Sequence, residues 1–229
     1  MKRGLALSSW SGGKDSGFAC YKAMQMGYEV KYLLNFISRE HKRCCFHGIA
    51  ADLIKLQAKL VGIPLIQKEV TADMQEYEKE FKEAVSEIRD KGIENMVFGD
   101  IYLNEQKNWV DRVSNDIGMR PIEPLWNKDT EKIIEDFIDV GFKSVVVSCK
   151  ADIFGKDFVG RIIDRKLLKE LKEKNICPCG ENGEFHTFLV DGPFFKEKIE
   201  ITRSESVLKA GFWKYYFLDI KEYKTVQKQ

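Results

Sequence analysis

The sequence lacks the features that mark a membrane, secreted or strongly charged protein. Its 229 residues contain no run of about 18 apolar residues, the minimum for a membrane-spanning helix. Lysine and arginine total 37 and aspartate and glutamate total 36, so no charge excess attracts nucleic acid over the whole surface. The apolar stretch near the N-terminus is too short for a signal-peptide core. We therefore expect a cytoplasmic protein with no membrane attachment and no direct nucleic-acid partner.

The six cysteines lack the spacing of common zinc sites, because no pair follows the CxxC pattern. The chain is also longer than the small, cysteine-dense secreted domains that depend on disulfides. Most of the cysteines are therefore expected to be ordinary thiols. Two close pairs, Cys44-Cys45 and Cys177-Pro178-Cys179, stay open as reactive or metal-binding groups. A turn fixed by the proline is the simpler interpretation of the second pair.

The first half of the chain alternates short apolar segments with amphipathic ones. Residues 4–8, 29–36, 63–66 and 93–98 predict strands, and residues 16–26, 49–61 and 74–91 predict helices. This alternation is typical of βαβ units, so we predict an α/β fold with a Rossmann-like parallel sheet. Ligands bind at the carboxyl ends of such strands. The loops at residues 11–16, 37–47 and 99–104 should therefore share one rim.

The second half has a different pattern. Residues 131–140 and 164–174 predict helices, and residues 144–149, 188–190, 199–201 and 213–218 predict strands of a mixed or antiparallel sheet. A loop rich in glycine and proline occupies residues 176–186, and the polar residues after Tyr223 should be frayed. We predict two domains, residues 1–124 and a smaller mixed α+β domain of residues 125–229. The aromatic residues at 213–217 permit a homodimer without requiring one.

One motif, SGGKDS at residues 11–16, follows the first predicted strand and opens the first predicted helix. Its members are Ser11, Gly12, Gly13, Lys14, Asp15 and Ser16. The glycines let the backbone approach a phosphate, and the helix start favours negative charge. The serine hydroxyls add donors, the lysine adds a cation, and Asp15 fits as a ligand of Mg²⁺ beside a polyphosphate. The motif therefore predicts a nucleotide phosphate site, with a serine-capped turn as the alternative.

The loop differs from a Walker A motif, which needs lysine directly before serine or threonine, because Asp15 separates Lys14 from Ser16. It resembles instead the SGGxDS signature of the PP-loop ATP pyrophosphatases. The resemblance implies a PP-loop type of fold and cleavage of ATP to AMP and pyrophosphate as a substrate oxygen is adenylated. It also implies that the loop holds the departing pyrophosphate and its Mg²⁺.

Further motifs resemble the pattern of the diphthine–ammonia ligases over nearly the whole chain. They are His47-Gly48-Ile49, Gly99-Asp100-Ile101, Glu123-Pro124-Leu125-Trp126, the segment from Glu181 to Thr187, and Asp191-Gly192-Pro193. The pattern Glu-x-Gly-Glu-aromatic-x-Thr at residues 181–187 is the most diagnostic, since generic PP-loop enzymes lack it. Asn182 and His186 stand where many relatives have glycine and glutamate.

This resemblance implies ATP-dependent amidation of diphthine, a trimethylated modified histidine on elongation factor 2. ATP adenylates the carboxylate, pyrophosphate leaves, and ammonia displaces AMP to give diphthamide. Carboxylates or aromatic faces can hold the quaternary ammonium of diphthine, and a carboxylate can bind ammonium or take a proton from it. The expected substrate-binding residues are Glu181, Gly183, Glu184, Phe185, Thr187 and Trp126.

Residues on the other rim loops complete the predicted site. Gly99 and Asp100 end a strand, where a carboxylate could reach the ribose, the Mg²⁺ or the nucleophile. His47 lies in the loop after the second strand and could stabilise phosphate charge. ATP is expected at residues 11–16 together with His47 and Gly99. The expected catalytic residues are Lys14, Asp15, Asp100 and Glu184, with Asp15 also the metal ligand.

Two alternatives stay open. A PP-loop ligase or sulfur transferase acting on tRNA or a small acid would also use ATP, and Cys44-Cys45 would suit sulfur chemistry. A non-catalytic ATP-binding module would keep the glycine-rich loop but has no need of the carboxylates beside it. For the amidation, free ammonium is the expected nitrogen source, because the chain shows no glutaminase domain.

Overall fold

A parallel sheet organises the N-terminal half of the computed structural model, which describes residues 3–45, 47–71, 73–210 and 214–228. Its strands are β1 (Gly4–Ser9), β2 (Tyr28–Ser38), β3 (Leu65–Val70), β4 (Asn95–Val97) and β5 (Arg120–Ile122). They lie in the order β3-β2-β1-β4-β5, and each neighbouring pair is parallel. The strand order reverses at β1, which is where sheets of this kind bind ligands. The predicted Rossmann-like α/β fold is confirmed.

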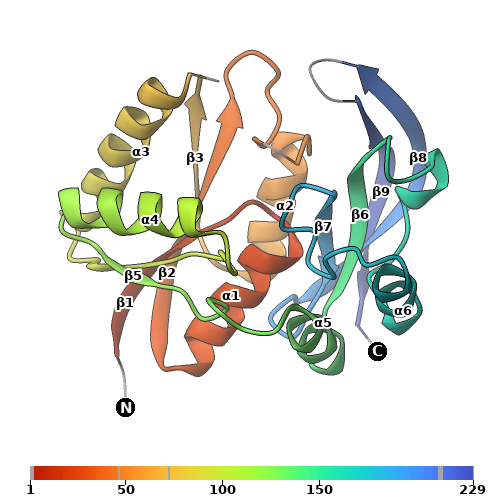
Figure 1. Cartoon of the computed structure of the whole chain (residues 1–229). Coiled ribbons are helices and arrows are strands. Elements are labelled where there is room, and N and C mark those ends of the chain that lie inside the picture. Colours follow the sequence, from red (N-terminus) through yellow and green to blue (C-terminus); the bar gives the residue numbers. More distant parts are fainter. Residues whose placement is uncertain (1–2, 46, 72, 211–213, 229) are drawn as a thin grey trace.

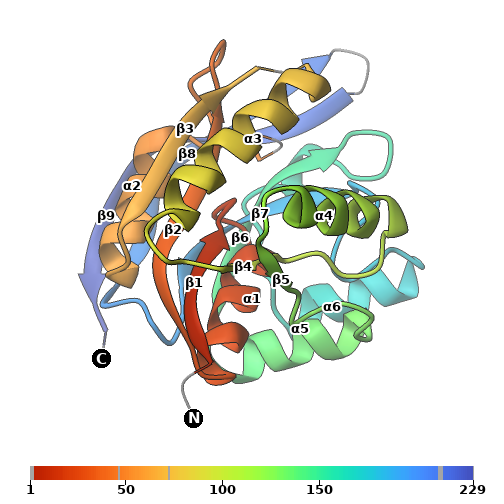
Figure 2. The same ribbon diagram turned by 90° about the vertical axis from the view of Figure 1, so that its left-hand side faces the viewer.

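Helices cover both faces of this sheet (Figures 1 and 2). They are α1 (Lys14–Gln25), α2 (Ala51–Val61), α3 (Met74–Arg89) and α4 (Asn104–Asp116). Neighbouring strand residues point to opposite faces. Ala6 and Leu33 accordingly pack in the core with α1 and α2, whereas Leu7 and Leu34 pack in the core with α3 and α4. No helix in the described ranges is long and apolar enough to cross a membrane.

The sequence pattern gives no prediction for two elements of this half, α4 and β5. α4 is mostly polar and buries only Val110, Val113 and Ser114, so its helical periodicity is weak. β5 has three residues, and Pro121 is one of them. β5 pairs with β4 and α4 packs against β5, and a local sequence window records neither contact.

An antiparallel sheet organises the C-terminal half. Its strands are β6 (Lys143–Lys150), β7 (Phe185–Asp191), β8 (Glu197–Ala210) and β9 (Lys214–Gln227), in the order β7-β6-β9-β8. The helices α5 (Thr130–Asp139) and α6 (Arg165–Glu173) and the short 3₁₀ helix η1 (Lys156–Phe158) accompany it. The predicted mixed α+β character is confirmed, whereas the division at residues 124 and 125 stays a prediction.

Two details of the C-terminal prediction are wrong. The residues after Tyr223 continue β9, and Gln227 pairs with Glu197 at the end of a long hairpin, so this segment is not frayed. The predicted loop at residues 176–186 ends early because β7 begins at Phe185. Trp213, the first residue of the aromatic stretch, lies outside the described residues.

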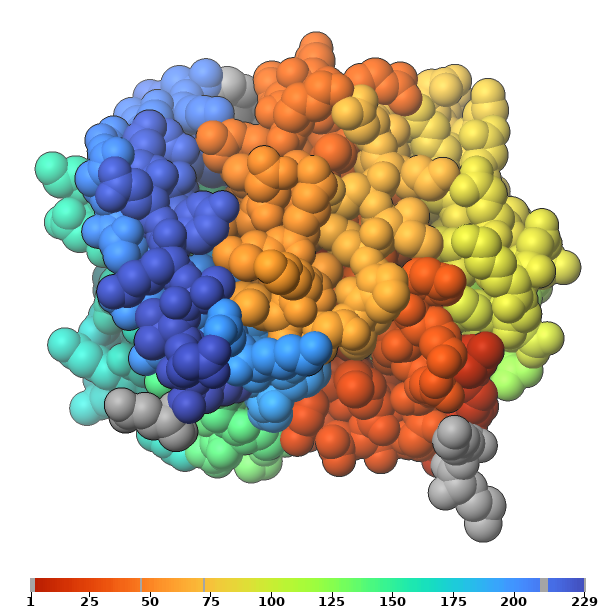
Figure 3. Space-filling view, turned by 180° about the vertical axis from the view of Figure 1, so that it is seen from behind, coloured from red at the N-terminus to blue at the C-terminus, as the bar shows by residue number. Residues whose placement is uncertain are grey.

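The two halves pack together through α1 and α2. Figure 3 shows the C-terminal strands, in blue, directly beside the orange surface of the α2 region. Lys196 N donates to Leu60 O of α2 at 2.9 Å, and Phe18 of α1 meets Phe142 edge to face with ring centroids 5.8 Å apart. These contacts join both halves in one hydrophobic core, so the rim of the parallel sheet faces the C-terminal region.

Candidate functional site

The glycine-rich loop leaves the carboxyl end of β1 and opens α1. Gly12 has a φ of +81°, a conformation that glycine adopts without strain. The hydroxyl of Ser11 accepts from Gly13 N at 3.3 Å and donates to Ser16 Oγ at 3.1 Å. Gly13 is the N-cap of α1 and offers no side-chain acceptor. The loop is therefore held by its own hydroxyls, with the positive end of α1 directed toward it.

The loops after β2 and β4 touch this segment so closely that glycine is required. A Cβ on Gly13 would lie 2.5 Å from Cε1 of His47, which belongs to the loop after β2. A Cβ on Gly99, which follows β4, would lie 2.9 Å from Ser16 N. Neither approach is compatible with a larger residue. The three loops therefore meet on one rim, as the sequence predicts.

Lys14 and Asp15 form the charged centre of the loop. The buried Lys14 Nζ donates to Asp15 Oδ2 at 2.7 Å and to Cys179 O at 2.5 Å, and it lies 5.5 Å from the ring centroid of Phe185. Burial alone would lower the pKa of Lys14, but the charge and hydrogen bond of Asp15 together with the charges of Cys179 and Glu181 outweigh burial and raise it. Among the described residues, Oδ1 of Asp15 is buried without a hydrogen-bond partner. One carboxylate oxygen is therefore left for a cation.

The C-terminal segment around Thr187 docks onto the glycine-rich loop. Thr187 Oγ1 accepts from Lys14 N at 3.0 Å, and Leu189 N donates to Gly12 O at 2.9 Å. The buried Gln57 of α2 donates to Gly12 O at 3.0 Å and to Leu189 O at 2.7 Å. Because these bonds are buried, they hold the C-terminal segment and the loop in one register.

These loops border a cavity of about 430 Å³. Ten predicted site residues line it, namely Ser11, Lys14, Asp15, His47, Gly99, Asp100, Glu181, Gly183, Phe185 and Thr187. Five lining residues are absent from the predicted site, namely Gln106, Cys179, Gly180, His186 and Tyr215. Three of these residues lie in or beside the motif at residues 181–187, namely Cys179, Gly180 and His186. Their closeness to the motif in the sequence is a signal that could have identified them. Gln106 and Tyr215 come from α4 and β9, and no sequence signal connects them to the rim.

Five predicted residues do not line the cavity, namely Gly12, Gly13, Ser16, Glu184 and Trp126. The first three shape the backbone of the glycine-rich loop. Glu184 is buried and accepts at both carboxylate oxygens from Asn182, from the backbone N and from Nδ2, each at 3.0 Å. Glu184 therefore braces its own loop. Trp126 follows β5, and Lys107 Nζ lies 5.9 Å from its ring centroid.

Carboxyl groups gather at the cavity. Burial, followed by the charges of Glu123 and Asp15, raises the pKa of Asp100 to about 6. Burial and the charge of Asp15 raise the pKa of Glu181 to about 8, against the opposing effect of Lys14. Without a ligand, Glu181 is therefore mostly protonated near neutral pH and Asp100 is mostly ionised, and a bound cation would favour the ionised form of both.

Two histidines line the cavity as neutral rings. His47 Nδ1 lies 3.0 Å from Thr187 O, so this nitrogen carries the proton and donates. The rings of His47 and His186 lie with centroids 4.9 Å apart. Burial lowers the pKa of both, that of His186 to about 3. In the empty site the pair therefore offers hydrogen bonds rather than positive charge.

A second cavity of about 410 Å³ adjoins the first between α3 and α4, and Asp100 and Gln106 line both. Four of its ten lining residues are aromatic, namely Tyr77, Phe81, Phe98 and Trp109. Trp109 Nε1 donates to Glu78 Oε2 at 3.2 Å, which fixes the orientation of the indole. Flat walls of this kind suit an aromatic ring.

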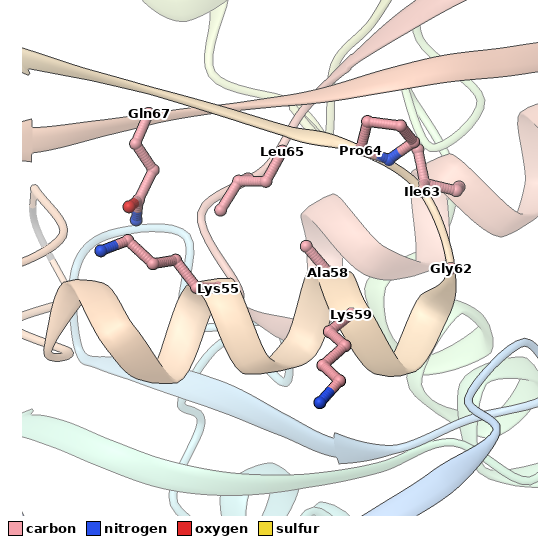
Figure 4. Close-up of a pocket in the computed structure, with 8 residues that line it drawn as sticks. All are labelled: Lys55, Ala58, Lys59, Gly62, Ile63, Pro64, Leu65 and Gln67. Atoms are coloured by element: carbon pink, nitrogen blue, oxygen red, sulfur yellow. The ribbon is translucent and has the colours of Figure 1, made fainter.

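A third hollow, of about 550 Å³, lies between α2 and β3 (Figure 4). Its residues are Lys55, Ala58, Lys59, Gly62, Ile63, Pro64, Leu65 and Gln67. In Figure 4, Lys55 and Gln67 approach each other at one end, and the side chain of Lys59 points away. None of the predicted site residues lines this hollow, and its polar side chains are those of Lys55, Lys59 and Gln67. The predicted site residues that line a cavity are found at the first two cavities instead.

The cysteines near the site are not activated. Cys44 is buried, its thiol donates to Ser11 O at 3.2 Å, and burial raises its pKa to about 12. Burial also raises the pKa of Cys45 and Cys179. Thiols of this kind are poor nucleophiles because the thiolate is the reactive form. Within the described part of the chain, no cluster of three or more metal-binding side chains is present.

Comparison with known proteins gives consistent results over both halves. Residues 3–121 match the family model of the diphthamide synthase N-terminal domain, and residues 129–226 match that of the diphthamide synthase C-terminal domain. The diphthine–ammonia ligase of Schizosaccharomyces pombe is 28% identical over 217 residues, which cover 86% of this chain and 36% of that protein. Those of Danio rerio and Homo sapiens are 24% and 25% identical, and the matches cover 86% and 84% of those proteins.

The chain thus spans about a third of the fission-yeast relative and most of the vertebrate ones. The matches cover 86% of this chain for the zebrafish protein and 88% for the human one. Among solved structures, one described as a predicted subunit of tRNA methyltransferase from Methanocaldococcus jannaschii is 14% identical with a TM-score of 0.46. That match covers 83% of this chain and 97% of the other.

Proposed function

Because the chain belongs to the diphthamide synthase family, we propose that it amidates diphthine on elongation factor 2, consuming ATP and ammonia. The observation that carries the proposal is that two motifs line one cavity of about 430 Å³. The glycine-rich loop with Asp15 suits a triphosphate, and the C-terminal loop with Glu181 and Phe185 suits a cationic acceptor. The activity named for the curated relatives requires both parts.

ATP would bind across the two adjoining cavities. The phosphates would lie against residues 11–16, where the loop backbone and the start of α1 favour negative charge. The adenine would enter the aromatic cavity between α3 and α4, stacking near Trp109. Asp100, which lines both cavities, would then lie beside the ribose or the α-phosphate. His47 would donate or accept a hydrogen bond at the phosphates as a neutral ring.

Magnesium would enter with ATP, and the residues present fit it. Asp15 Oδ1 is buried and has no partner among the described residues, while Lys14 holds the other carboxylate oxygen at 2.7 Å. The carboxylate is therefore fixed with one oxygen available, and phosphate oxygens and water would complete the shell. When bound, the ion would screen the phosphate charge and stabilise the leaving pyrophosphate.

The acceptor would approach from the C-terminal loop. Glu181 and Phe185 would hold the trimethylammonium group, while Glu184 keeps the loop in shape through Asn182. The diphthine carboxylate oxygen attacks the α-phosphorus, and the bond to pyrophosphate breaks. Ammonia nitrogen then bonds to the acyl carbon, the bond from that carbon to the AMP oxygen breaks, and AMP leaves. Relative to ammonium, the new amide has lost two protons.

The substrate supports one further proposal, on the compartment. Elongation factor 2 acts in translation, so we propose the cytoplasm as the compartment. A homodimer stays a prediction. The sulfur-transfer alternative is not favoured, because the family match points to ligation and Cys44 is a buried, protonated thiol. The non-catalytic alternative is not favoured either, since the carboxylates of Asp15, Asp100 and Glu181 surround the cavity.

The proposal is tested by incubating the protein with diphthine-bearing elongation factor 2, ATP, Mg²⁺ and ammonium. We expect AMP and pyrophosphate in equal amounts and a mass loss of about one dalton on the modified histidine, as for conversion of an acid to an amide. Elongation factor that lacks diphthine serves as the control and should give no AMP. ATP binding without turnover on verified diphthine substrate would refute the proposal.

A further inference from the structure

Tyr215 lines the first cavity, yet the proposed reaction gives it no role. Its strand, β9, lies between β6 and β8 (Figure 1). At Tyr215 this strand pairs with Lys150 of β6 on one side and with Lys209 of β8 on the other. Because side chains two residues apart on a strand share one face, Phe217 lies on the same face of β9 as Tyr215.

This face of β9 packs on the loop after β2. The ring centroids of Tyr215 and Phe217 lie 6.1 Å apart, and a Cβ on Gly48 would lie 3.0 Å from Cδ1 of Phe217. Gly48 directly follows His47, which lines the cavity. The strand thus brings Tyr215 to the cavity from the C-terminal half, next to the rim of the parallel sheet.

Three successive carbonyl groups of the C-terminal loop are held by β6 and β9. Lys150 donates to Asn182 O through Nζ and to Glu184 O through its backbone N, each at 2.9 Å. Between these two bonds, the hydroxyl of Tyr215 donates to Gly183 O at 3.1 Å. Because its hydroxyl is bound in this way, the ring of Tyr215 has a fixed place beside the loop.

Phe185 by itself offers little surface to an acceptor. It is only 1% exposed, and Lys14 Nζ already lies 5.5 Å from its ring centroid. Tyr215 is half-buried, so more of its side chain is accessible. Apart from the two histidines, Phe185 and Tyr215 are the aromatic members of the described cavity lining. Tyr215 therefore supplies the larger accessible aromatic surface at this site.

The quaternary ammonium of the proposed acceptor needs a surface of this kind. It is positively charged but has no N–H, so it cannot donate a hydrogen bond to a carboxylate. The face of an aromatic ring attracts such a cation without a hydrogen bond. Burial raises the pKa of Tyr215 above its ordinary value. The phenol therefore stays neutral and keeps the proton that it donates to Gly183.

We propose that Tyr215 forms a second aromatic wall of the site for the acceptor's trimethylammonium group, together with Glu181 and Phe185. This inference rests on the proposed function. The ring of Tyr215 contacts the cation, and its hydroxyl anchors the ring to the loop that carries Glu181. Tyr215 is thus a specificity-determining residue, because its ring favours a quaternary ammonium over an uncharged group of the same shape.

The test compares choline, which has a trimethylammonium group, with dimethylbutanol, its uncharged analogue in which carbon replaces the nitrogen. Binding of each to the full chain is measured by NMR titration. In Tyr215→Leu, the Kd for choline should rise by about tenfold because the contact between cation and ring is lost. The Kd for the uncharged analogue should change by less than about threefold. In Tyr215→Phe, which keeps the ring, the choline Kd should stay within about threefold of the wild-type value.

The same variants are assayed with diphthine-bearing elongation factor 2. Tyr215→Leu should raise the KM for the elongation factor by about tenfold and leave the KM for ATP within about twofold, which also shows that the variant is folded. Tyr216→Phe is the matched control. Tyr216 is the next residue of β9, points to the opposite face and is not part of the described cavity lining. It should leave both KM values and the choline Kd unchanged.

Equal losses of choline affinity in Tyr215→Phe and Tyr215→Leu would mean that the hydroxyl only braces the loop, and they would overturn the contact. An unchanged choline Kd in folded Tyr215→Leu would overturn it too, as would equal losses for choline and its uncharged analogue.

A measurement on the wild-type protein covers the case in which Tyr215→Leu does not fold. Nuclear Overhauser contacts between the choline methyl protons and the ring protons of Tyr215 should be seen, and their absence would overturn the proposal. If the wild-type protein fails to amidate diphthine, the proposed function fails, and the choline titration still decides whether a quaternary ammonium binds at Tyr215.

Discussion

The two halves of the molecule contribute to one cavity by different means. The N-terminal half presents a contiguous loop, residues 11–16, at the switch point of a parallel sheet, and it acts mainly through backbone groups and the end of α1. The C-terminal half presents side chains from the irregular segment before β7. Within this segment, Glu184 accepts two hydrogen bonds from Asn182 and so stabilises the loop itself. The proposed phosphate site is therefore built from the backbone of the parallel-sheet fold, whereas the proposed acceptor site depends on how one half docks on the other.

Lys14 shows how closely the halves depend on each other. It belongs to the phosphate loop, yet its ammonium is bound by the Cys179 carbonyl of the C-terminal half at 2.5 Å, and its backbone N–H is bound by Thr187. A residue of the proposed ATP site thus holds Cys179 and Thr187 of the C-terminal half in place. We call the contacts of residues 12–17 with Cys179, Thr187 and Leu189 the joint between the halves. The comparison predicts that a change within one half impairs one partial reaction, and that a change at the joint destabilises the protein and impairs both partial reactions.

The largest effect is expected for Asp15→Asn, which alters the N-terminal half alone. The substitution keeps the shape of the side chain but removes the charge that would hold Mg²⁺, so pyrophosphate release should fall by about 100-fold, or roughly 2.7 kcal/mol in the barrier. Binding of diphthine-bearing elongation factor should be unchanged. Pyrophosphate release and a pull-down of the elongation factor measure the two halves separately.

Asp52→Asn is the matched control for this change, since Asp52 is an acidic residue in the first turn of α2 with a side chain that is 80% exposed. Its turnover should equal that of the wild type. Pyrophosphate release at near wild-type rate in Asp15→Asn would show that the carboxylate is structural. Equal loss of elongation-factor binding would show that the halves do not act separately.

The second-largest effect is expected for Gly17→Ala, because the added methyl group would push α1 away from β7 at the joint. A Cβ at this helical position would lie 2.0 Å from Cδ1 of Leu189, which is fully buried in β7. Alanine favours the helix by about 1 kcal/mol over glycine, but overpacking of a tight core costs about 1–3 kcal/mol. We expect a net loss of stability, measured by urea unfolding, and a decline in both partial reactions.

Two companion variants identify the clash as the cause. Gly155→Ala introduces the same methyl group where nothing lies within 4 Å, so its urea midpoint should be unchanged. Adding Leu189→Val to Gly17→Ala removes part of the obstructing side chain and should recover stability relative to the single variant. A Gly17→Ala protein more stable than the wild type would mean that the helix preference outweighs the contact.

The sequence predicts the N-terminal half more completely than the C-terminal half, for a physical reason. Regular alternation of strands and helices and a contiguous motif are local properties, so the parallel sheet and the rim at residues 11–16 follow from short windows. The hairpin of β8 and β9 is set by pairing between distant residues, and the polar end after Tyr223 gives no local sign of it. α4 is missed because its buried face is so narrow.

The candidate site likewise divides into features that a local motif predicts and features that depend on tertiary contacts. The motif at residues 181–187 identifies the right segment but not which carboxylate faces the cavity, and Glu184 turns inward to Asn182 while Glu181 lines the cavity. Side-chain direction in an irregular loop depends on tertiary contacts that a motif does not contain. Gln106 and Tyr215 reach the cavity only because distant elements pack there. Whether each predicted residue acts in the reaction stays a prediction.

The smallest effect is expected for His186, where the two halves meet ring to ring. Burial lowers the pKa of His186 from 6.5 to about 3. Between these values the unfolded chain binds a proton that the folded protein does not, so stability is present at higher pH and is lost as pH falls below 6.5. From pH 7.5 to pH 5.5 the loss from this one group is about 1.4 kcal/mol. His186→Gln should lose that much less stability over the same interval, measured as urea midpoints at the two pH values.

The protein offers its own control for this last measurement. His41 has a side chain that is 75% exposed, so His41→Gln should keep the pH dependence of the wild type. His47 is buried like His186, and burial lowers its pKa too, so part of the acid sensitivity should remain in His186→Gln and fall further when both rings are replaced. Identical pH dependence in His186→Gln and the wild type would show that the ring takes up its proton without disturbing the joint. The contact between the halves would then be looser than the 4.9 Å ring separation implies.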